Sequence, residues 1–284
     1  MKIDLHTHSN FSDGTDRPSE LINKALSQGI TTLALTDHDT VAGWDEAMQW
    51  LRPGMELVLG SEISCQTEDG ISVHMLGLLF NRENQPLQEM MAATRDNRLG
   101  RMERIITKMN AAGIEITIEE VHAQLSEGAT LGRPHLADAL VAKGLAKSRD
   151  EVFADWLANS SPFYVAHYSP TPEVAIAAIK AAGGVAVIAH PLASLRGRVV
   201  NLESFDSYIA AGLDGIEVKH RDQTPEQQEL LFSIAASADL AMTGSSDYHG
   251  NGKMNELAEF TTDPDQWEKL EARADDRRVV RKAS

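Results

Sequence analysis

Hydrophobic and polar positions along the chain follow two patterns, short apolar runs and longer amphipathic segments. Short runs bounded by turn residues are typical of strands, and apolar positions three or four residues apart are typical of helices. In the first 80 residues the pattern predicts strands at 2–8, 31–39, 56–65 and 71–80, and helices at 18–29 and 45–51. A short Asp-Gly connection joins the third and fourth runs, so we expect a hairpin there.

The pattern of hydrophobic and polar positions changes after Phe80. Only helical periodicity follows, with helices predicted at 90–113, 117–125, 133–144 and 149–158. The alternation then resumes, with helices at 172–184, 203–212 and 225–238 and strands at 185–191, 215–220 and 240–250. About seven strands separated by helices indicate an α/β protein close to a parallel (β/α) barrel.

The stretch that contains helices alone defines the predicted domains. We assign residues 1–83 and 166–284 to a barrel domain and residues 84–165 to an inserted helical subdomain. The last eight residues, RRVVRKAS, are basic and are expected to fray.

Histidines and carboxylates gather where the predicted strands end. They are His6 and His8, Asp37 and His38, Glu62, His74, His190, and Asp247 and His249, with Asp13 in the turn after the first strand. Residues i and i+2 of a strand share a face, so His6 and His8 point together, as do Asp247 and His249. A barrel brings the carboxyl ends of its strands to one mouth, where these side chains could meet.

Each residue alone has an ordinary explanation. An H-x-H pair can be two exposed histidines, and Asp16 can cap the helix that follows it. His74 and His190, in apolar strands, can be hydrogen-bonded core residues. Six of the ten histidines nevertheless fall at the same predicted barrel mouth, and this favours a metal site. His122 and His167 fall outside the pattern and are interpreted as surface or core residues.

Mixed imidazole and carboxylate ligands suit Zn²⁺, Mn²⁺ or Fe²⁺, and the nine candidates that remain when Asp37 is set aside are too many for one ion. The sequence therefore predicts a cluster of two or three metal ions. Such clusters activate water and stabilise the oxygens of an in-line displacement, which is hydrolytic chemistry.

Composition narrows the function classes. With 42 acidic and 26 basic residues the formal charge is -16, which disfavours duplex DNA as a partner, so an anionic ligand must meet a local basic pocket. The single cysteine, Cys65, allows no intramolecular disulfide and is interpreted as a buried small hydrophobe. The start of the sequence is not that of a signal peptide, and no apolar run approaches the ~20 residues of a membrane span. We expect a soluble cytoplasmic protein with no membrane or obligate protein partner.

Six short stretches together resemble the PHP family, named for polymerase-associated and histidinol-phosphatase members. They are HTHSNFSDG, LALTDHDT, LGSEIS, VHMLG, VIAHP and GSSDYHG, in that order along the chain. The resemblance implies a distorted (β/α)₇ barrel with three divalent metal ions, manganese first and zinc or iron as alternatives. It implies that His6, His8, Glu62 and Asp247 hold one ion. Glu62 would bridge to a second ion at His74 and His190, and Asp13, His38 and His249 would hold the third.

The helical insertion carries LGRPHLADAL, similar to a bacterial subgroup of the family. That subgroup removes the 3′-phosphate from nucleoside 3′,5′-bisphosphates and can shorten RNA from its 5′ end. The similarity implies that Arg133 and His135 reach over the metals toward substrate. Pro134 at a helix start agrees, because helix N-termini favour anions. Arg133 could instead be a solvated surface charge.

Two further basic stretches follow strands at the predicted mouth. Lys219 is the strongest phosphate-binding candidate there and Arg198 a second one. Arg196, Arg198 and Arg221 could equally balance the acids around them.

We predict hydrolysis of the 3′-phosphate of a nucleoside 3′,5′-bisphosphate by a hydroxide that bridges the metals, with Arg133 spreading charge. Either His135 or a water would protonate the leaving oxygen. The alternatives are 5′-3′ exoribonuclease action on short single-stranded RNA at the same site and a histidinol-phosphatase-like activity. A non-catalytic interaction module is a fourth possibility, which the complete ligand set disfavours.

Overall fold

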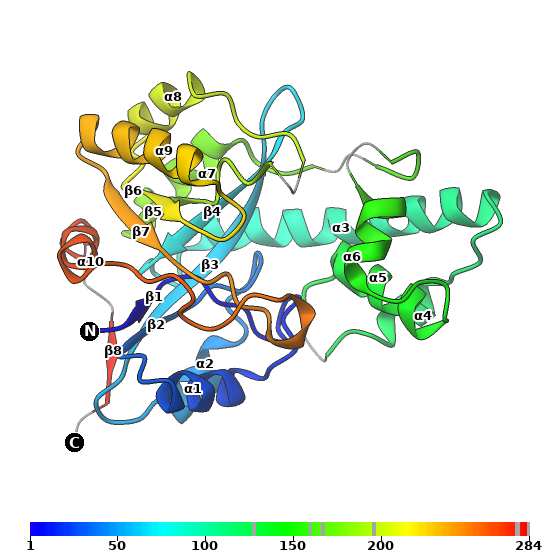
Figure 1. The fold of residues 1–284 in the computed structure, drawn as a ribbon, viewed down its shortest axis with the longest axis horizontal. Coiled ribbons are helices and arrows are strands. Elements are labelled where there is room, and N and C mark those ends of the chain that lie inside the picture. Colours follow the sequence, from blue (N-terminus) through cyan, green and yellow to red (C-terminus); the bar gives the residue numbers. More distant parts are fainter. Residues whose placement is uncertain (127–128, 159–160, 166–167, 195–196, 276–278, 283–284) are drawn as a thin grey trace.

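The computed structural model describes the chain except for residues 127–128, 159–160, 166–167, 195–196, 276–278 and 283–284. His167 and Arg196 lie outside the described residues. The described chain has a barrel part and a helical part that projects from it (Figure 1). None of its helices combines the length and the apolar character needed to cross a membrane.

One sheet forms the barrel part, with strand order β1-β2-β3-β4-β5-β6-β7. The strands are β1 Ile3–Asp4, β2 Thr32–Leu35, β3 Glu56–Gln66, β4 Ser72–Leu78, β5 Val185–Ala189, β6 Gly215–Lys219 and β7 Ala241–Gly244. Neighbouring strands are parallel, except that β4 runs antiparallel to β3 and β5. A single bridge between Thr7 and Tyr248 links the segments after β1 and β7, so the barrel is nearly closed. The predicted hairpin and the distorted seven-strand barrel are confirmed.

The helices of the barrel part are α1 Pro18–Ser27, α2 Trp44–Trp50, α7 Pro172–Ala181, α8 Ser204–Ala210, α9 Pro225–Ser237 and α10 Pro264–Glu271. Strand side chains alternate between two cores, as the period of two requires. In β5, Val185 and Val187 face the barrel interior, whereas Ala186 and Ile188 pack beneath the helices. The interior also holds Trp267 of α10, whose helix the sequence pattern did not predict.

Two expectations about local structure are wrong. Asp16 does not cap α1: its carboxylate accepts hydrogen bonds from Lys24 Nζ at 2.7 Å and from the Tyr248 hydroxyl at 2.8 Å. The basic tail is not simply frayed, because Val280–Arg281 forms strand β8 beside β3, and Arg281 donates to Glu56 at 2.6 Å. The salt bridge between Arg281 and Glu56 joins two distant strands, so the local sequence pattern could not predict it.

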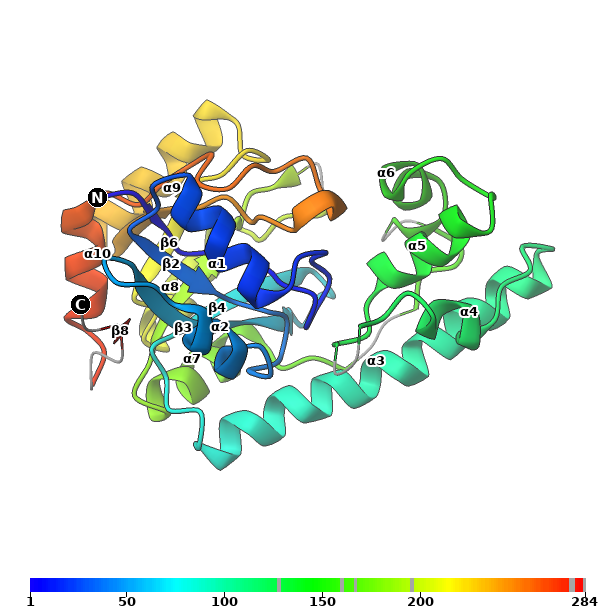
Figure 2. The same ribbon diagram turned by 90° about the horizontal axis from the view of Figure 1, so that it is seen from below.

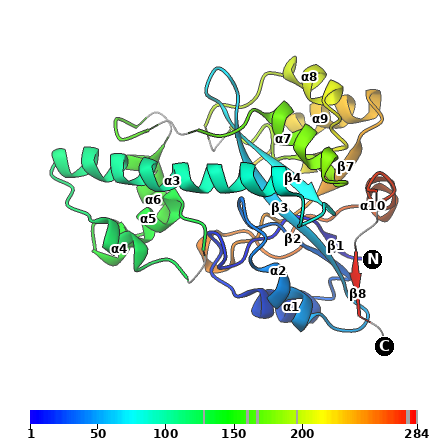
Figure 3. The ribbon, with the colours of Figure 1, turned by 180° about the vertical axis from the view of Figure 1, so that it is seen from behind.

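The projecting part contains most of α3 Gln85–Ala111, then α4 Ile118–His122, α5 Arg133–Ala142 and α6 Arg149–Val152, which continues as a π-helix over Phe153–Leu157. Figures 2 and 3 show α3 as a long rod that runs from the barrel to the tip of this part. Leu87 and Met91, near the start of α3, pack in the barrel's core. A separate apolar cluster from Met102 to Leu157 holds the outer helices together. The predicted boundary at residue 84 stays a prediction, although α3 belongs to both parts.

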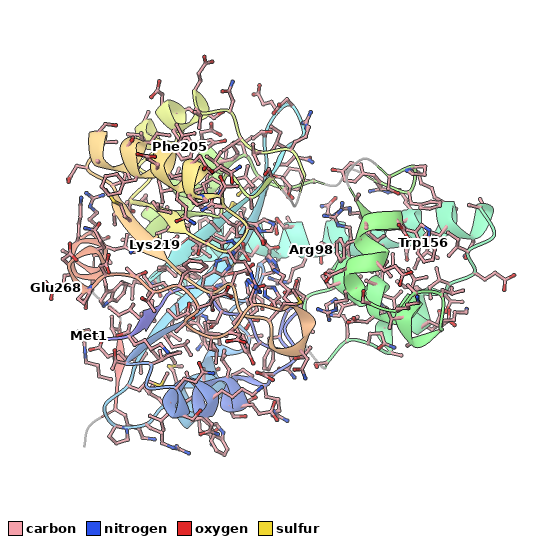
Figure 4. All side chains as sticks on the ribbon, in the orientation of Figure 1. Met1, Arg98, Trp156, Phe205, Lys219 and Glu268 are labelled. Atoms are coloured by element: carbon pink, nitrogen blue, oxygen red, sulfur yellow. The ribbon has the colours of Figure 1, made fainter. Side chains whose placement is uncertain are left out.

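A buried ion pair joins α3 to the barrel. Arg98 Nη2 lies 2.6 Å from Asp39 Oδ2, and the Asp39 carboxylate also accepts the Ser64 N–H at 2.8 Å. The Asp39 side chain is fully buried, and Figure 4 shows Arg98 at the junction of the two parts. Arg95, one turn earlier, donates to the Asp39 carbonyl.

We expect Asp39→Asn to lower the free energy of unfolding by about 3 kcal/mol, because removing one partner of a buried pair leaves the other charge uncompensated. Urea unfolding followed by circular dichroism measures the effect. The control is Asp45→Asn, which breaks an exposed pair with Arg82 and should cost below about 1 kcal/mol. Equal losses in the two variants would show that the Asp39 pair does not stabilise the junction.

Candidate metal centre

The segment after β1 supplies the first two candidate ligands. His6 and His8 lie on one face, with their Nε2 atoms 3.0 Å apart. The bridge at Thr7, the residue between them, fixes this segment against Tyr248. Both rings are fully buried. The pairing expected from the i, i+2 spacing is therefore present.

Glu62, on β3, stands at the middle of the cluster. Its carboxylate oxygens lie 3.2 Å from His6, 3.0 Å from His8, 3.3 Å from His38, 2.7 Å from His74 and 3.3 Å from His190. One buried carboxylate thus faces five imidazoles from strands that are far apart in the sequence.

Two aspartates complete the arrangement. Asp247 Oδ1 lies 3.4 Å from a ring nitrogen of His6 and 3.4 Å from one of His8. Asp13 lies 3.2 Å from His249 and 3.8 Å from His38. Among the described residues, four overlapping sets have ligand atoms within 4.8 Å of one another: His6, His8, Glu62 and Asp247; His38, Glu62 and His74; His8, Asp13, His38 and His249; and His6, His190 and Glu217. All nine predicted residues meet in one place.

The donor set fits divalent cations. Buried ligand atoms of His38, Glu62, His74 and His249 make no hydrogen bond to the described residues, although each lies 3.3 Å or less from another ligand atom. A buried polar atom without a partner costs free energy, and a cation would satisfy all four. Imidazole and carboxylate together suit Mn²⁺, Fe²⁺ and Zn²⁺.

The electrostatics favour the metal-binding forms of Glu62, His38 and His249. They do not favour those of His6 and His8, because facing carboxylates outweigh burial and raise the pKa of His6 and that of His8, the latter to about 9. Burial alone would raise the pKa of Glu62, but the facing His74, His38 and His6 outweigh it and hold that pKa well below its usual range. Burial lowers the pKa of His38 to about 3 and that of His249 to about 4. An ionised carboxylate and neutral imidazoles are the ligand forms that cations need.

Two buried groups behind these ligands were missed from the sequence. Glu217 Oε1 lies 3.1 Å from His6 Nδ1, and its Oε2 accepts the His190 N–H at 2.8 Å. His220 lies 3.6 Å from Asp247. Glu217 could have been found, because it is a charge in the middle of the apolar strand Gly215–Lys219. A carboxylate on the far nitrogen of a ligating histidine fixes its tautomer and orientation.

Above the ligands the structure contains a cavity of about 810 Å³ between the barrel and the projecting helices. Asp13, His38, His74 and His190 line it on the barrel side. Seven described cationic side chains also line it, against three acids (Asp13, Asp150 and Asp222): Arg98, Arg101, Arg133, Arg149, Arg198, Arg221 and Lys253. In a chain of net charge -16 the wall of this cavity carries more cations than acids, although five of the seven cations also pair with carboxylates beyond these three acids.

The predicted substrate-binding residues differ in their placement. Arg133 lines the cavity at the start of α5, where its Nη1 donates to the Leu157 carbonyl at 2.7 Å and its guanidinium lies over the Phe153 ring. Arg198 also lines the cavity, and donates to the Asp69 carbonyl.

The structure places two of the predicted substrate-binding residues, His135 and Lys219, away from the cavity. His135 is buried, accepts the Gly132 N–H on Nδ1 at 3.1 Å at the start of α5, and does not line the cavity. Lys219 pairs with the exposed Asp263 at 3.3 Å, on the side of the barrel away from the insertion (Figure 4). A bulge between Glu217 and Lys219 ends β6 there, which a strand-end argument could not anticipate.

Comparison with known proteins agrees with this geometry. The family model described as PHP domain matches residues 4–174. The chain belongs to the PHP family. A 5′-3′ exoribonuclease of Haemophilus influenzae is 37% identical over 87% of this chain and 90% of its own length. A 3′,5′-nucleoside bisphosphate phosphatase of Chromobacterium violaceum is 32% identical over 95% of this chain and 97% of its own.

A solved structure is also similar. A protein of Bifidobacterium adolescentis described as a metal-dependent phosphoesterase superposes with a TM-score of 0.90 at 43% identity, covering 96% of each chain. The PHP resemblance expected from the six stretches is thereby confirmed.

Proposed function

We propose that this PHP protein is a metal-dependent phosphoesterase that removes the 3′-phosphate from nucleoside 3′,5′-bisphosphates. The observation that carries the proposal is one cavity with seven cations around it and four of the nine metal-ligand candidates on its wall, the other five being clustered with these four. A substrate with two phosphates needs a place for each, and this cavity offers two chemically different ones. The relatives named above support the same class of substrate.

Three ions are proposed, manganese first, held by the three sets that contain no Glu217, with His190 joining Glu62 and His74. Bound divalent cations would supply an activated water at neutral pH and positive charge for the phosphoryl oxygens. The cytoplasmic location expected from the sequence remains a prediction.

The chain's own side chains bind and orient the substrate. Arg133 and Arg101 border the cavity from the insertion, and Arg198 and Lys253 border it from the barrel loops. Lys253 Nζ also lies 2.9 Å from Asp247 Oδ2, so this ammonium links the ligand set to the cavity wall. A guanidinium binds a phosphate with two parallel hydrogen bonds, which fixes the orientation of the second phosphate. The projecting helices narrow the access of water to the reacting phosphorus.

The products test the proposal directly. Metal-loaded protein incubated with adenosine 3′,5′-bisphosphate should release phosphate and leave adenosine 5′-monophosphate, as resolved by liquid chromatography and mass spectrometry. Adenosine 3′-monophosphate as the product would reverse the proposed orientation. No phosphate release from any bisphosphate would contradict the function.

Exoribonuclease action on short 5′-phosphorylated RNA is the second candidate. It is favoured by the 37% identity to the Haemophilus influenzae protein. The same ligands would serve both reactions.

Glu217→Gln tests the orientation of His6. We expect metal affinity to fall about 10- to 100-fold, because the charge behind the His6 ring is lost. Competition with a chromophoric chelator measures the affinity, and the exposed Glu229→Gln on α9 is the matched control. Unchanged affinity in Glu217→Gln would remove this residue from the metal centre.

A further inference from the structure

A second hollow lies on the projecting part, on the other side of Arg101 from the main cavity. It measures about 470 Å³ and is lined by Arg104, Thr107 and Lys108 of α3 and by Tyr164 and Val165. None of these residues is a candidate ligand or borders the main cavity. Its lining, two cations and an aromatic ring, differs from that of a structural void, which is apolar.

Arg101 forms the wall between the two spaces. It lines the main cavity, while its Nε donates to the Val165 carbonyl at 2.8 Å and its guanidinium lies 5.4 Å from the centre of the Tyr164 ring. Both Val165 and Tyr164 line the second hollow. The two spaces are therefore adjacent, and a ligand that leaves the main cavity past Arg101 meets Tyr164 next.

Basic residues continue along α3 from one space to the other. Arg98 and Arg101 border the main cavity, and Arg104 and Lys108 follow at helical spacing beside the hollow. Arg101 and Lys108 are about 10 Å apart along the axis at 1.5 Å per residue. Burial lowers the pKa of Arg101 to about 9, and the neighbouring Arg133, Arg98 and Arg104 add to the effect. Arginines this close repel one another, and a polyanion along the row would relieve that repulsion.

We propose that the second hollow binds the next nucleotides of a single-stranded RNA whose 5′ end lies in the main cavity. Tyr164 offers a ring on which a base can stack, and Arg104 and Lys108 offer charges for the backbone phosphates. Aromatic rings combined with a basic groove are the features by which proteins hold single strands without reading sequence. Lys108 keeps its position by donating to the Tyr164 carbonyl at 2.8 Å. This inference rests on the proposed function, because it extends the substrate from a mononucleotide to an oligonucleotide.

The test compares Arg104→Glu and Thr107→Glu with Lys147→Glu. All three positions are exposed on the projecting part, and Lys147 borders neither space. Binding of a 3′-fluorescein, 5′-phosphorylated RNA tetranucleotide is measured by anisotropy in EDTA, where no hydrolysis takes place. Activity on adenosine 3′,5′-bisphosphate is measured separately with metal.

We expect Arg104→Glu and Thr107→Glu to weaken tetranucleotide binding about tenfold. Arg104→Glu should also lower the slope of log affinity against log salt by about 0.7, the value for one phosphate contact on a single strand. Activity on the bisphosphate should stay within about twofold of the wild type, and Lys147→Glu should change neither quantity by more.

Two results would overturn the inference. In the first, the wild type binds the tetranucleotide no more tightly than a 5′-phosphorylated dinucleotide. In the second, Arg104→Glu and Lys147→Glu weaken tetranucleotide binding equally. Either result together with normal bisphosphate hydrolysis would leave the proposed function intact. Failure of bisphosphate hydrolysis with intact tetranucleotide binding would instead contradict the proposed mononucleotide reaction and leave the RNA site standing.

Discussion

Glu62→Gln should lower kcat for phosphate release by at least about 10³-fold, because a catalytic metal centre supplies several kcal/mol and each 1.4 kcal/mol is tenfold in rate. Glu62 faces five imidazoles, so a neutral amide there removes the charge common to two of the four ligand sets. Steady-state kinetics on adenosine 3′,5′-bisphosphate measure the loss, and elemental analysis measures the bound metal.

The matched control is Glu56→Gln, the same change at the start of the same strand. Glu56 pairs with Arg281 on the surface, far from the ligands. This variant should keep its metal and nearly all its activity. Near-normal turnover in Glu62→Gln, with its circular dichroism unchanged, would remove Glu62 from the centre of the reaction.

Arg133→Ala should reduce kcat/KM on the bisphosphate by about 10- to 100-fold, the equivalent of one lost hydrogen-bonded charge at 1.5–3 kcal/mol. On a simple aryl phosphate, which has no second phosphate, the loss should stay within about threefold. The ratio of the two substrates separates binding of the second phosphate from a general loss of folding.

Lys143→Ala is the control for Arg133→Ala. Lys143 follows the same helix α5, but its Nζ pairs with Glu120 at 2.8 Å. Lys143→Ala should leave kcat/KM unchanged on both substrates. An equal loss on both substrates in Arg133→Ala would contradict its role at the second phosphate and would place it among the residues that merely support the fold.

Much of the fold follows from local pattern. The short apolar run of β5 and the Asp-Gly turn before β4 indicated strand and hairpin, and His6 and His8 indicated a shared face because a strand fixes that geometry. The nine ligands could be grouped because parallel strands end at one mouth.

What could not be predicted depends on contacts between distant segments. Glu217 and His220 act through His6 and Asp247, and their pairing requires the barrel to close. Lys219 turns away because of a bulge that forms where β6 pairs with β7, and the burial of His135 depends on how the insertion packs. The arginines of α3 can be read from the sequence. Their orientation toward the cavity could not be predicted, because it depends on the ion pair of Arg98 with Asp39.

Removal and return of metal is the most direct test of the account. Protein stripped with a chelator should release no phosphate from adenosine 3′,5′-bisphosphate, and titration with Mn²⁺ should restore turnover as the bound metal rises to between two and three ions per chain, with adenosine 5′-monophosphate as the product. Full turnover in metal-free protein, or saturation with fewer than two ions per chain, would contradict it.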